Sequence, residues 1–266
     1  MRNPKLKNPI GLGLVFCLVL AVSAVLETST YAFPTSFTDD FNDGVLNTTN
    51  LQDVSGAFTE SGGVIRNTTS GPVLRRYIRT VDSDFNTASL GFVAEIDLNV
   101  SGTDILYFGF GPGTPDGTTF DEPFGAFFRS HTSNLVGGRL DFATNTVANG
   151  VLESSSVLGS PGDGTHRGQI TFDGIDTLTF AYDQNFSGSF FADFSTNVSL
   201  SSLSLNSTNS RLYFGHGLTG STSSFDNLSV NVAPIPEPAT IALLGIGLAG
   251  LAGIGVRRRL KLKKSK

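Results

Sequence analysis

An apolar run near the C-terminus limits what this chain can fold into more than any other feature. The 18 residues from Ala239 to Val256 carry no charge, and as an α-helix they would be about 27 Å long at about 1.5 Å per residue. That length roughly matches the hydrocarbon core of a bilayer, about 30 Å. Because a single segment in lipid must satisfy its own backbone hydrogen bonds, residues 239–256 are predicted to form a transmembrane helix.

Prolines precede this run and basic residues follow it. Pro234, Pro236 and Pro238 suit an extended segment and cannot lie inside a helix. Basic residues stay on the cytoplasmic side of a membrane, so everything upstream is predicted to lie outside the cytoplasm. We assign residues 234–262 to a sorting and anchor segment and 257–266 to a basic cytoplasmic tail. The membrane stop consists of Arg257, Arg258 and Arg259.

The N-terminus has the three parts of a secretory signal peptide. Three basic residues precede an apolar stretch from Ile10 to Leu26, and small residues follow up to Ala32. We assign residues 1–32 to a signal peptide that signal peptidase cleaves after Ala32 or, as a second choice, after Ala24. A retained N-terminal membrane helix is the alternative. Residues 33–233 would then form the exported domain.

The C-terminal segment resembles the PEP-CTERM sorting signal of Gram-negative bacteria. The resemblance rests on Pro236, Glu237 and Pro238, then a Gly/Leu/Ile-rich run and three arginines, in this order. It implies recognition and processing by an exosortase, an integral-membrane cysteine protease. The protein would be anchored in the inner membrane before processing and would then reach the cell surface or the extracellular polysaccharide. A C-terminal anchor that is never cleaved is the alternative.

The exported domain is acidic and has no cysteine. Between Phe33 and Ala233 there are eight arginines, no lysine and 21 acidic residues, which gives a formal charge of −13. This charge argues against nucleic acid and anionic membrane surfaces as partners. Because no disulfide can form, stability must come from packing, for which 21 phenylalanines supply material, or from a bound metal.

Alternation of apolar and polar residues predicts β-strands in this domain. From Leu90 to Val100 every even-numbered residue is apolar, as in a strand with one buried face. No segment has the pattern of an amphipathic helix. About a dozen short strands in about 200 residues predict an all-β fold of two packed antiparallel sheets. The other predicted strands are 105–110, 124–129, 139–142, 147–152, 169–172, 177–182, 211–215 and 228–232.

Three short segments, 37–44, 170–174 and 224–230, resemble the terminal strands and a central hairpin of concanavalin-A-like jelly rolls of the laminin-G and laminarinase type. The resemblance implies a two-sheet antiparallel jelly-roll sandwich whose first and last strands lie side by side, with a structural calcium ion near their ends. Asp40 or Asp43 together with Asp226 would supply oxygen ligands for Ca²⁺. The alternative is that these aspartates only form turns.

The sequence contains no catalytic pair. Retaining glycosidases need two carboxylates about 5–5.5 Å apart, and the laminarinase-like branch supplies them from a Glu-x-Asp-x-x-Glu strand. Here Glu95 and Asp97 are followed by Val100 in place of the second glutamate, so both acids are expected on a solvated outer strand face. The spacing of His131, His166 and His216 matches no metal motif, and each is expected at the surface or at a strand edge.

We therefore expect no catalytic residue and a non-enzymatic exported protein. The favoured interpretation is a structural or adhesive component of the cell surface or exopolysaccharide. One alternative is a carbohydrate-binding module that contacts polysaccharide through the loops Gly111–Gly117 and Ser160–Gly164, although tryptophan is absent. A divergent glycoside hydrolase is the second alternative. The tyrosines left as candidate sugar contacts are Tyr77, Tyr107, Tyr182 and Tyr213.

Overall fold

A computed structural model describes most of the exported domain. The described residues are 34–68, 76–85, 91–102, 104–113, 124–133, 136–145, 154–203, 205, 210–217 and 222–233. They belong to one compact unit, residues 33–234. The predicted signal peptide, the transmembrane helix, the sorting residues Pro236–Pro238 and the arginines 257–259 lie outside them. Within the described part of the chain, no helix has the length and hydropathy that a membrane crossing needs.

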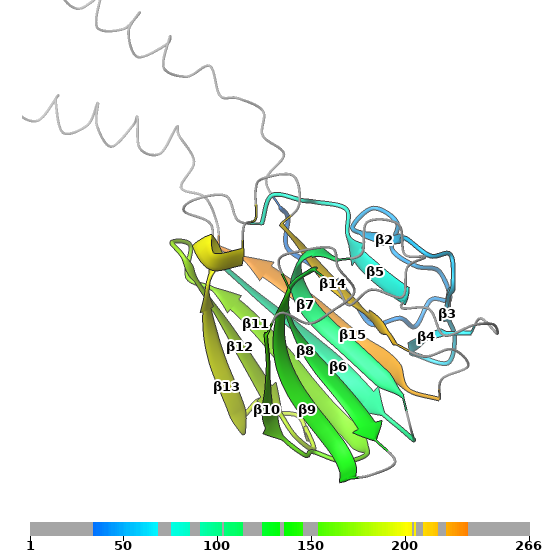
Figure 1. Cartoon of the computed structure of the whole chain (residues 1–266). Helices are drawn as coiled ribbons and strands as arrows, with labels where there is room; N and C mark the ends of the chain where they lie inside the picture. The colour runs from blue at the N-terminus through cyan, green and yellow to red at the C-terminus, as the bar shows by residue number, and fades with distance from the viewer. Residues whose placement is uncertain are drawn as a thin grey trace, which may run out of the picture. The chain divides into compact units, whose positions relative to one another are not determined.

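The unit consists of two antiparallel β-sheets packed face to face (Figure 1). The strands are β1 (Phe37–Asp39), β2 (Leu51–Asp53), β3 (Phe58–Glu60), β4 (Ile65–Asn67), β5 (Arg76–Thr80), β6 (Phe92–Val100), β7 (Ile105–Gly113), β8 (Phe124–Ser133), β9 (Val136–Asn145), β10 (Ser154–Gly159), β11 (Gly164–Phe172), β12 (Thr177–Asp183), β13 (Phe194–Ser199), β14 (Arg211–His216) and β15 (Ser224–Val232). A 3-10 turn, Leu200–Leu203, follows β13. The predicted all-β class is confirmed.

We name the sheets A and B, and the strands counted in each are those of the described residues. Sheet A has eight strands in the order β13-β12-β11-β6-β15-β4-β3, with β1 pairing to β15 beside this path. Sheet B has seven strands in the order β10-β9-β8-β7-β14-β5-β2. This arrangement is consistent with the predicted jelly-roll sandwich. The predicted strand at 147–152 falls outside the described residues.

The main core lies between the sheets. Strand β6, which pairs with β11 on one side and β15 on the other, shows why the sequence folds this way. Its even-numbered residues are buried and contribute to the core, as the alternation predicted: Phe92, Ala94, Ile96, Leu98 and Val100. Its odd-numbered residues therefore point to the outer face of sheet A, where the polar groups gather.

The opposite side of sheet B has a second, smaller core of Tyr77, Tyr107, Phe127, Ala143 and Tyr213. The ring of Tyr77 lies 5.6 Å from that of Tyr107 and 5.8 Å from that of Tyr213. Since Tyr182 lies in the main core, all four candidate tyrosines are buried. None of them presents a ring to solvent for stacking on a sugar.

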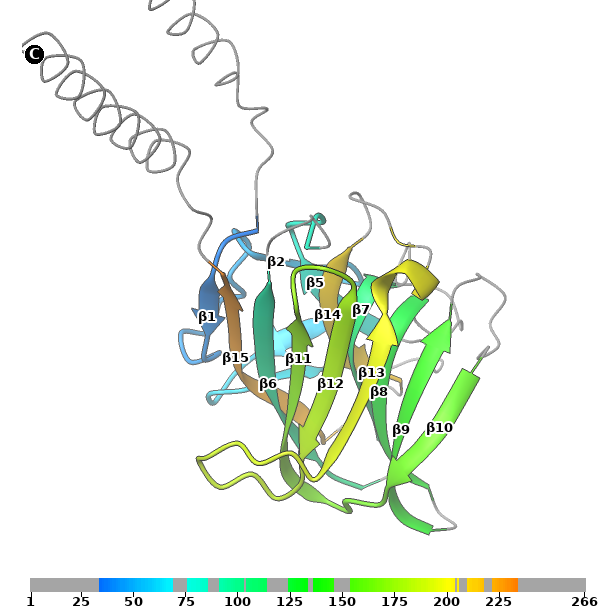
Figure 2. The ribbon, with the colours of Figure 1, turned by 90° about the vertical axis from the view of Figure 1, so that its left-hand side faces the viewer.

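The first and last strands of the domain are neighbours (Figure 2). In their antiparallel pairing Phe37 faces Val230 and Asp39 faces Leu228, as the resemblance to jelly rolls implied. Strand β15 is irregular just before this point, where its register with β6 shifts between Asp226 and Ser229. The loop that follows β1 therefore lies next to the irregular part of β15.

Candidate functional site

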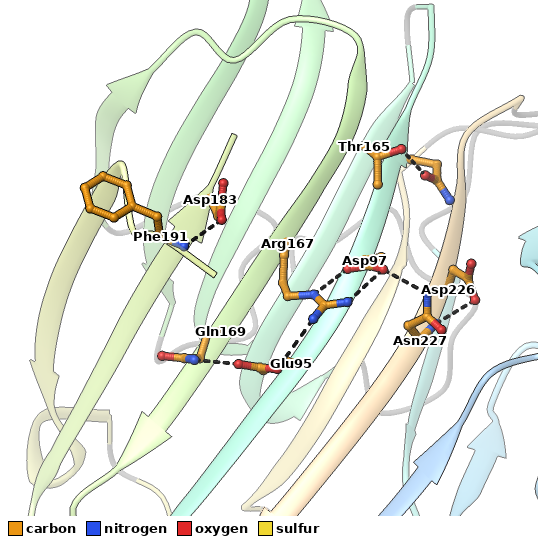
Figure 3. Close-up of polar contacts among 10 residues, drawn as sticks. Glu95, Asp97, Thr165, Arg167, Gln169, Asp183, Phe191, Asp226 and Asn227 are labelled. Atoms are coloured by element: carbon orange, nitrogen blue, oxygen red, sulfur yellow. Dashed lines mark hydrogen bonds and ion pairs between the residues drawn. The ribbon is translucent and has the colours of Figure 1, made fainter. Parts of the chain in front are cut away.

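The outer face of sheet A carries a ladder of hydrogen-bonded polar side chains (Figure 3). Pairing of β11 with β6 sets Arg167 opposite Asp97 and Gln169 opposite Glu95. Arg167 donates from Nε and Nη2 to the two carboxylate oxygens of Asp97 at 2.6 and 2.9 Å. Asn227 of β15 donates to Asp97 Oδ2 at 2.9 Å, and Gln169 donates to Glu95 Oε1 at 2.7 Å. The ladder thus ties β15, β6 and β11 together.

Arg167 is the central residue of this ladder. Its side chain is 18% exposed and that of Asp97 is 6% exposed, so their ion pair is largely shielded from water. Burial alone would lower the pKa of Arg167, but the hydrogen bond with Asp97 and the charges of Asp97, Glu95 and Asp183 outweigh it and raise that pKa. The guanidinium carbon lies 3.7 Å from the ring centroid of Phe186, a cation–π distance.

Phe186 belongs to the connection between β12 and β13. Two carboxylates fix this connection: Asp193 Oδ2 accepts the N–H of Gln184 at 2.8 Å, and Asp183 Oδ2 accepts the N–H of Phe191 at 2.7 Å. Phe191 itself is 75% exposed. The guanidinium of Arg167 is thus held on one side by β6 and on another by a hydrogen-bonded loop.

The pair Glu95 and Asp97 lies on the outer face, as expected, but Asp97 is not solvated. Its oxygens are taken by Arg167 and Asn227. Residue 100, where a laminarinase-like strand would carry its second glutamate, is a valine 3% exposed in the main core. The strand therefore places one carboxylate in an ion pair and offers no second carboxylate beside the other.

A groove with a volume of about 340 Å³ runs beside the ladder. It lies at the edge where β1 pairs with β15, and its wall has both polar and apolar groups. A second hollow, of about 530 Å³, is formed by β1 and the loop after it, and it shares Thr38, Asp39 and Asp40 with the groove. The groove beside the ladder is lined by Thr38, Asp39, Asp40, Glu95, Arg167, Asn227, Leu228 and Ser229.

The three aspartates proposed as calcium ligands come to this edge of sheet A but serve in turns. Asp40 Oδ1 accepts the N–H of Asn42 at 3.4 Å, and Asp43 Oδ1 accepts that of Val45 at 2.9 Å. Asp226 Oδ1 accepts the N–H of Asn227 at 2.7 Å. In the described ranges no group of three or more His, Cys, Asp or Glu side chains could hold a metal ion. Calcium therefore stays a prediction.

Sequence reasoning missed two carboxyl groups, those of the half-buried Asp39 and the buried Glu60. Glu60 is 8% exposed, and its Oε1 accepts the N–H of Gly44 at 2.8 Å. Among the described residues, the buried oxygens Glu60 Oε2 and Asp39 Oδ2 have no hydrogen-bond partner. Burial raises the pKa of both carboxyl groups, and the charge of Asp43 raises both further. No motif links positions so far apart, so only the fold reveals this pair.

We expect Glu60→Gln to stabilise the protein at neutral pH. Because Asp39 and Glu60 have raised pKa values in the folded state, the folded state binds protons more tightly than the unfolded state. The free energy of unfolding therefore falls as the pH rises above their ordinary values, 3.8 and 4.5. Glutamine keeps an acceptor for Gly44 and removes one charge, so the variant should gain about 1 kcal/mol at neutral pH.

Denaturant unfolding of the full chain between about pH 4 and pH 8 measures this effect, since the variant should also lose part of the pH dependence. Ile175→Ala is the control, because it changes an exposed side chain that has no titratable group and should leave the pH dependence unchanged. A Glu60→Gln protein less stable than the native chain at neutral pH would contradict the interpretation.

Two of the histidines are buried, contrary to the expectation that they lie at the surface or at strand edges. His166 and His216 are both 0% exposed. His216 Nδ1 lies 2.9 Å from Asp104 Oδ2. His166 Nδ1 accepts the N–H of Asn185 at 3.1 Å, and burial lowers the pKa of this ring. Each ring serves packing and loop anchoring.

Comparison with known proteins gives different results for the sorting segment and for the exported domain. The family model of the PEP-CTERM protein-sorting motif matches residues 234–259, so the chain carries this sorting motif. No curated protein matches the chain.

Among solved structures, the potassium-bound carbohydrate recognition domain of Emp46p is 12% identical with a TM-score of 0.47, covering 74% of this chain and 95% of that one. The Lotus tetragonolobus seed lectin is 12% identical with a TM-score of 0.48, over 76% and 100% of the two chains. Lectin II from Ulex europaeus is 16% identical with a TM-score of 0.47, over 75% and 97%. These neighbours are legume-lectin-like domains of the concanavalin-A-like class, and a likeness this distant assigns no ligand.

Proposed function

We propose that this protein is a non-enzymatic component of the cell surface or exopolysaccharide, with a structural or adhesive role. The sorting motif at residues 234–259 indicates export and a C-terminal membrane-anchored sorting signal. The observation that carries the non-enzymatic part is the ladder on sheet A. There the acids nearest to a glycosidase pair are Glu95 and Asp97, and Asp97 is committed to Arg167.

An activity assay tests this part of the proposal. The full chain, incubated with polysaccharides, should release no reducing sugar. Release that disappears in the Glu95→Gln variant would favour a divergent glycoside hydrolase instead, because Glu95 is the member of the Glu95 and Asp97 pair that is not held in a bidentate ion pair. Release that is unchanged in Glu95→Gln would equally contradict a non-enzymatic protein.

Carbohydrate binding is the second candidate function. The groove beside Arg167 favours carbohydrate binding. It has a volume of about 340 Å³, and its wall combines hydroxyl, amide, carboxylate and guanidinium groups. Binding sites for sugars need such a mixture of donors and acceptors, since every sugar hydroxyl can both donate and accept a hydrogen bond.

Processing by signal peptidase and an exosortase-type protease is part of the same proposal. Mass spectrometry of the protein from its native cell should find an N-terminus at Phe33 and a C-terminus between Pro236 and Thr240. A Glu237→Ala variant should keep its full tail if the sorting motif guides the protease, whereas Asp163→Asn should be processed normally. Recovery of only intact Lys266 from native cells would leave an uncleaved anchor.

A structural calcium ion is retained as part of the proposal at the β1–β15 edge. Burial raises the pKa of Asp226, and the charges of Asp97 and Asp40 raise it further, so Asp40 repels Asp226 across this edge. An ion would relieve this repulsion. The melting temperature should then fall on addition of a chelator and recover with Ca²⁺. A melting temperature that the chelator leaves unchanged would end the calcium proposal.

A further inference from the structure

We propose that the groove on the outer face of sheet A binds an uncharged polysaccharide, and that Arg167 and Glu95 together hold one of its hydroxyl groups. This inference rests on the second candidate function, carbohydrate binding. It adds the place of the site, the two groups that contact the ligand and the chemical class of the sugar.

The distance between Arg167 and Glu95 carries the inference. Arg167 Nη1 and Glu95 Oε2 form an ion pair with the two atoms 3.8 Å apart (Figure 3), which is too long for a hydrogen bond. The other two nitrogens of the guanidinium, Nε and Nη2, donate to Asp97, and the other oxygen of Glu95, Oε1, accepts a hydrogen bond from Gln169. One donor and one acceptor therefore lie side by side in the groove wall without being satisfied by each other.

A hydroxyl group in the groove can bridge such a pair from the side. It can accept a hydrogen bond from Nη1 and donate its own hydrogen to Oε2 at the same time. Both bonds would involve a charged partner, which makes them stronger than bonds between neutral groups. Asn227, Thr38 and Ser229 in the same wall supply further donors and acceptors for neighbouring hydroxyls.

The site is rigid before any ligand arrives. Arg167 is held by two hydrogen bonds to Asp97 and by the ring of Phe186, and Glu95 is held by Gln169. Binding to fixed side chains avoids the entropic cost of ordering them, which is about 0.5–1.5 kcal/mol for each long side chain. Preorganised polar groups of this kind are what a shallow groove needs to bind a hydrated sugar.

The charges around the groove select the class of sugar. Its wall contains the carboxyl groups Asp39, Asp40 and Glu95, while its cation, Arg167, is already paired with Asp97. The exported domain as a whole has a formal charge of −13, so a polysaccharide with carboxylate or sulfate groups is repelled. Arg167 Nη1 disfavours a cationic ligand at the same point. An uncharged polysaccharide meets neither obstacle.

Affinity electrophoresis of the full chain tests the inference. The protein should be kept in a detergent without a sugar head group, which would otherwise compete. The probes are four uncharged polysaccharides (dextran, laminarin, xylan and galactomannan) and alginate as the anionic one. We expect retardation by at least one uncharged probe and none by alginate.

Variants then locate the site. Glu95→Gln places an amide N–H group or carbonyl where the carboxylate accepted the sugar hydroxyl, and affinity should fall about tenfold, since one hydrogen bond to a charged group contributes roughly that factor. Phe186→Ala loosens Arg167 and should weaken binding by a smaller factor. Ile175→Ala changes an exposed apolar residue elsewhere and should bind normally. Circular dichroism confirms that each variant is folded.

The results distinguish a failure of carbohydrate binding from a failure of the proposed site. If none of the four uncharged probes retards the native chain, carbohydrate binding fails and the site fails with it. If the native chain binds and Glu95→Gln binds within twofold of it, carbohydrate binding stands and the groove is the wrong site. If alginate binds as tightly as the uncharged probes, the selection by charge is wrong.

Discussion

Replacing Phe128 with alanine should lower the free energy of unfolding by about 4 kcal/mol, the range observed for loss of a buried aromatic side chain. Phe128 of β8 is 0% exposed. Its ring lies 5.5 Å from that of Phe180 and 5.6 Å from that of Tyr182, both in β12. Because β8 belongs to sheet B and β12 to sheet A, this one ring joins the two halves of the sandwich.

Denaturant unfolding of the full chain, followed by circular dichroism, measures the change. Phe191→Ala is the matched control, since it removes the same ring from a position that is 75% exposed, and its effect should stay within about 0.5 kcal/mol. A Phe128→Ala variant that does not fold at all agrees with the prediction. Similar small losses in both variants would mean that the packing between the sheets is looser than the ring contacts indicate.

The sequence predicts strands where one face is buried and the other is wet. β6 was predicted because its even-numbered residues enter the main core, and the hairpin of β11 and β12 because both strands are regular and a turn at Asp173 joins them. Strands β2, β3 and β4 were missed, since three residues each are too few to show a period. β10 was missed because its first four residues, Ser154 to Val157, are exposed.

The tyrosines show a different limit of sequence reasoning. In β7 both faces are buried, so Leu106 and Phe108 enter the main core while Tyr107 enters the second core on the other side of sheet B. A strand buried on both faces reads as a continuous apolar run, and no alternation tells which residues remain available for a ligand. Only the fold shows that Tyr107 and the other three candidate tyrosines are buried and cannot stack on a sugar.

The candidate site could be predicted only in part. Glu95 and Asp97 were placed on the outer face correctly, because alternation fixes the face. Their partner Arg167 is 70 residues away from Asp97, and only the register of β11 against β6 sets the two side chains opposite each other. The same holds for Asn227, which reaches Asp97 because β15 is irregular at that point.

Arg167 should prove as important for stability as for binding. Arg167→Met removes the cation from Asp97, which is 6% exposed and has the carboxylates of Glu95 and Asp226 nearby. A buried charge left without its partner costs on the order of 3 kcal/mol. Neutralising that charge as well should restore most of the loss, so the double variant Arg167→Met/Asp97→Asn should be more stable than Arg167→Met alone.

Denaturant unfolding of the four proteins in this double-mutant cycle gives the coupling between the two residues. Arg139→Met is the matched control on sheet B. Its partner Asp141 is also buried, but Asp141 keeps a second cation, Arg129, at 2.7 Å, so the loss should be smaller than for Arg167→Met. If the double variant is no more stable than Arg167→Met, the ion pair is not what holds β11 to β6. Glu95→Gln leaves that pair intact, so it should weaken sugar binding with little change in stability, and this difference separates the two roles of the ladder.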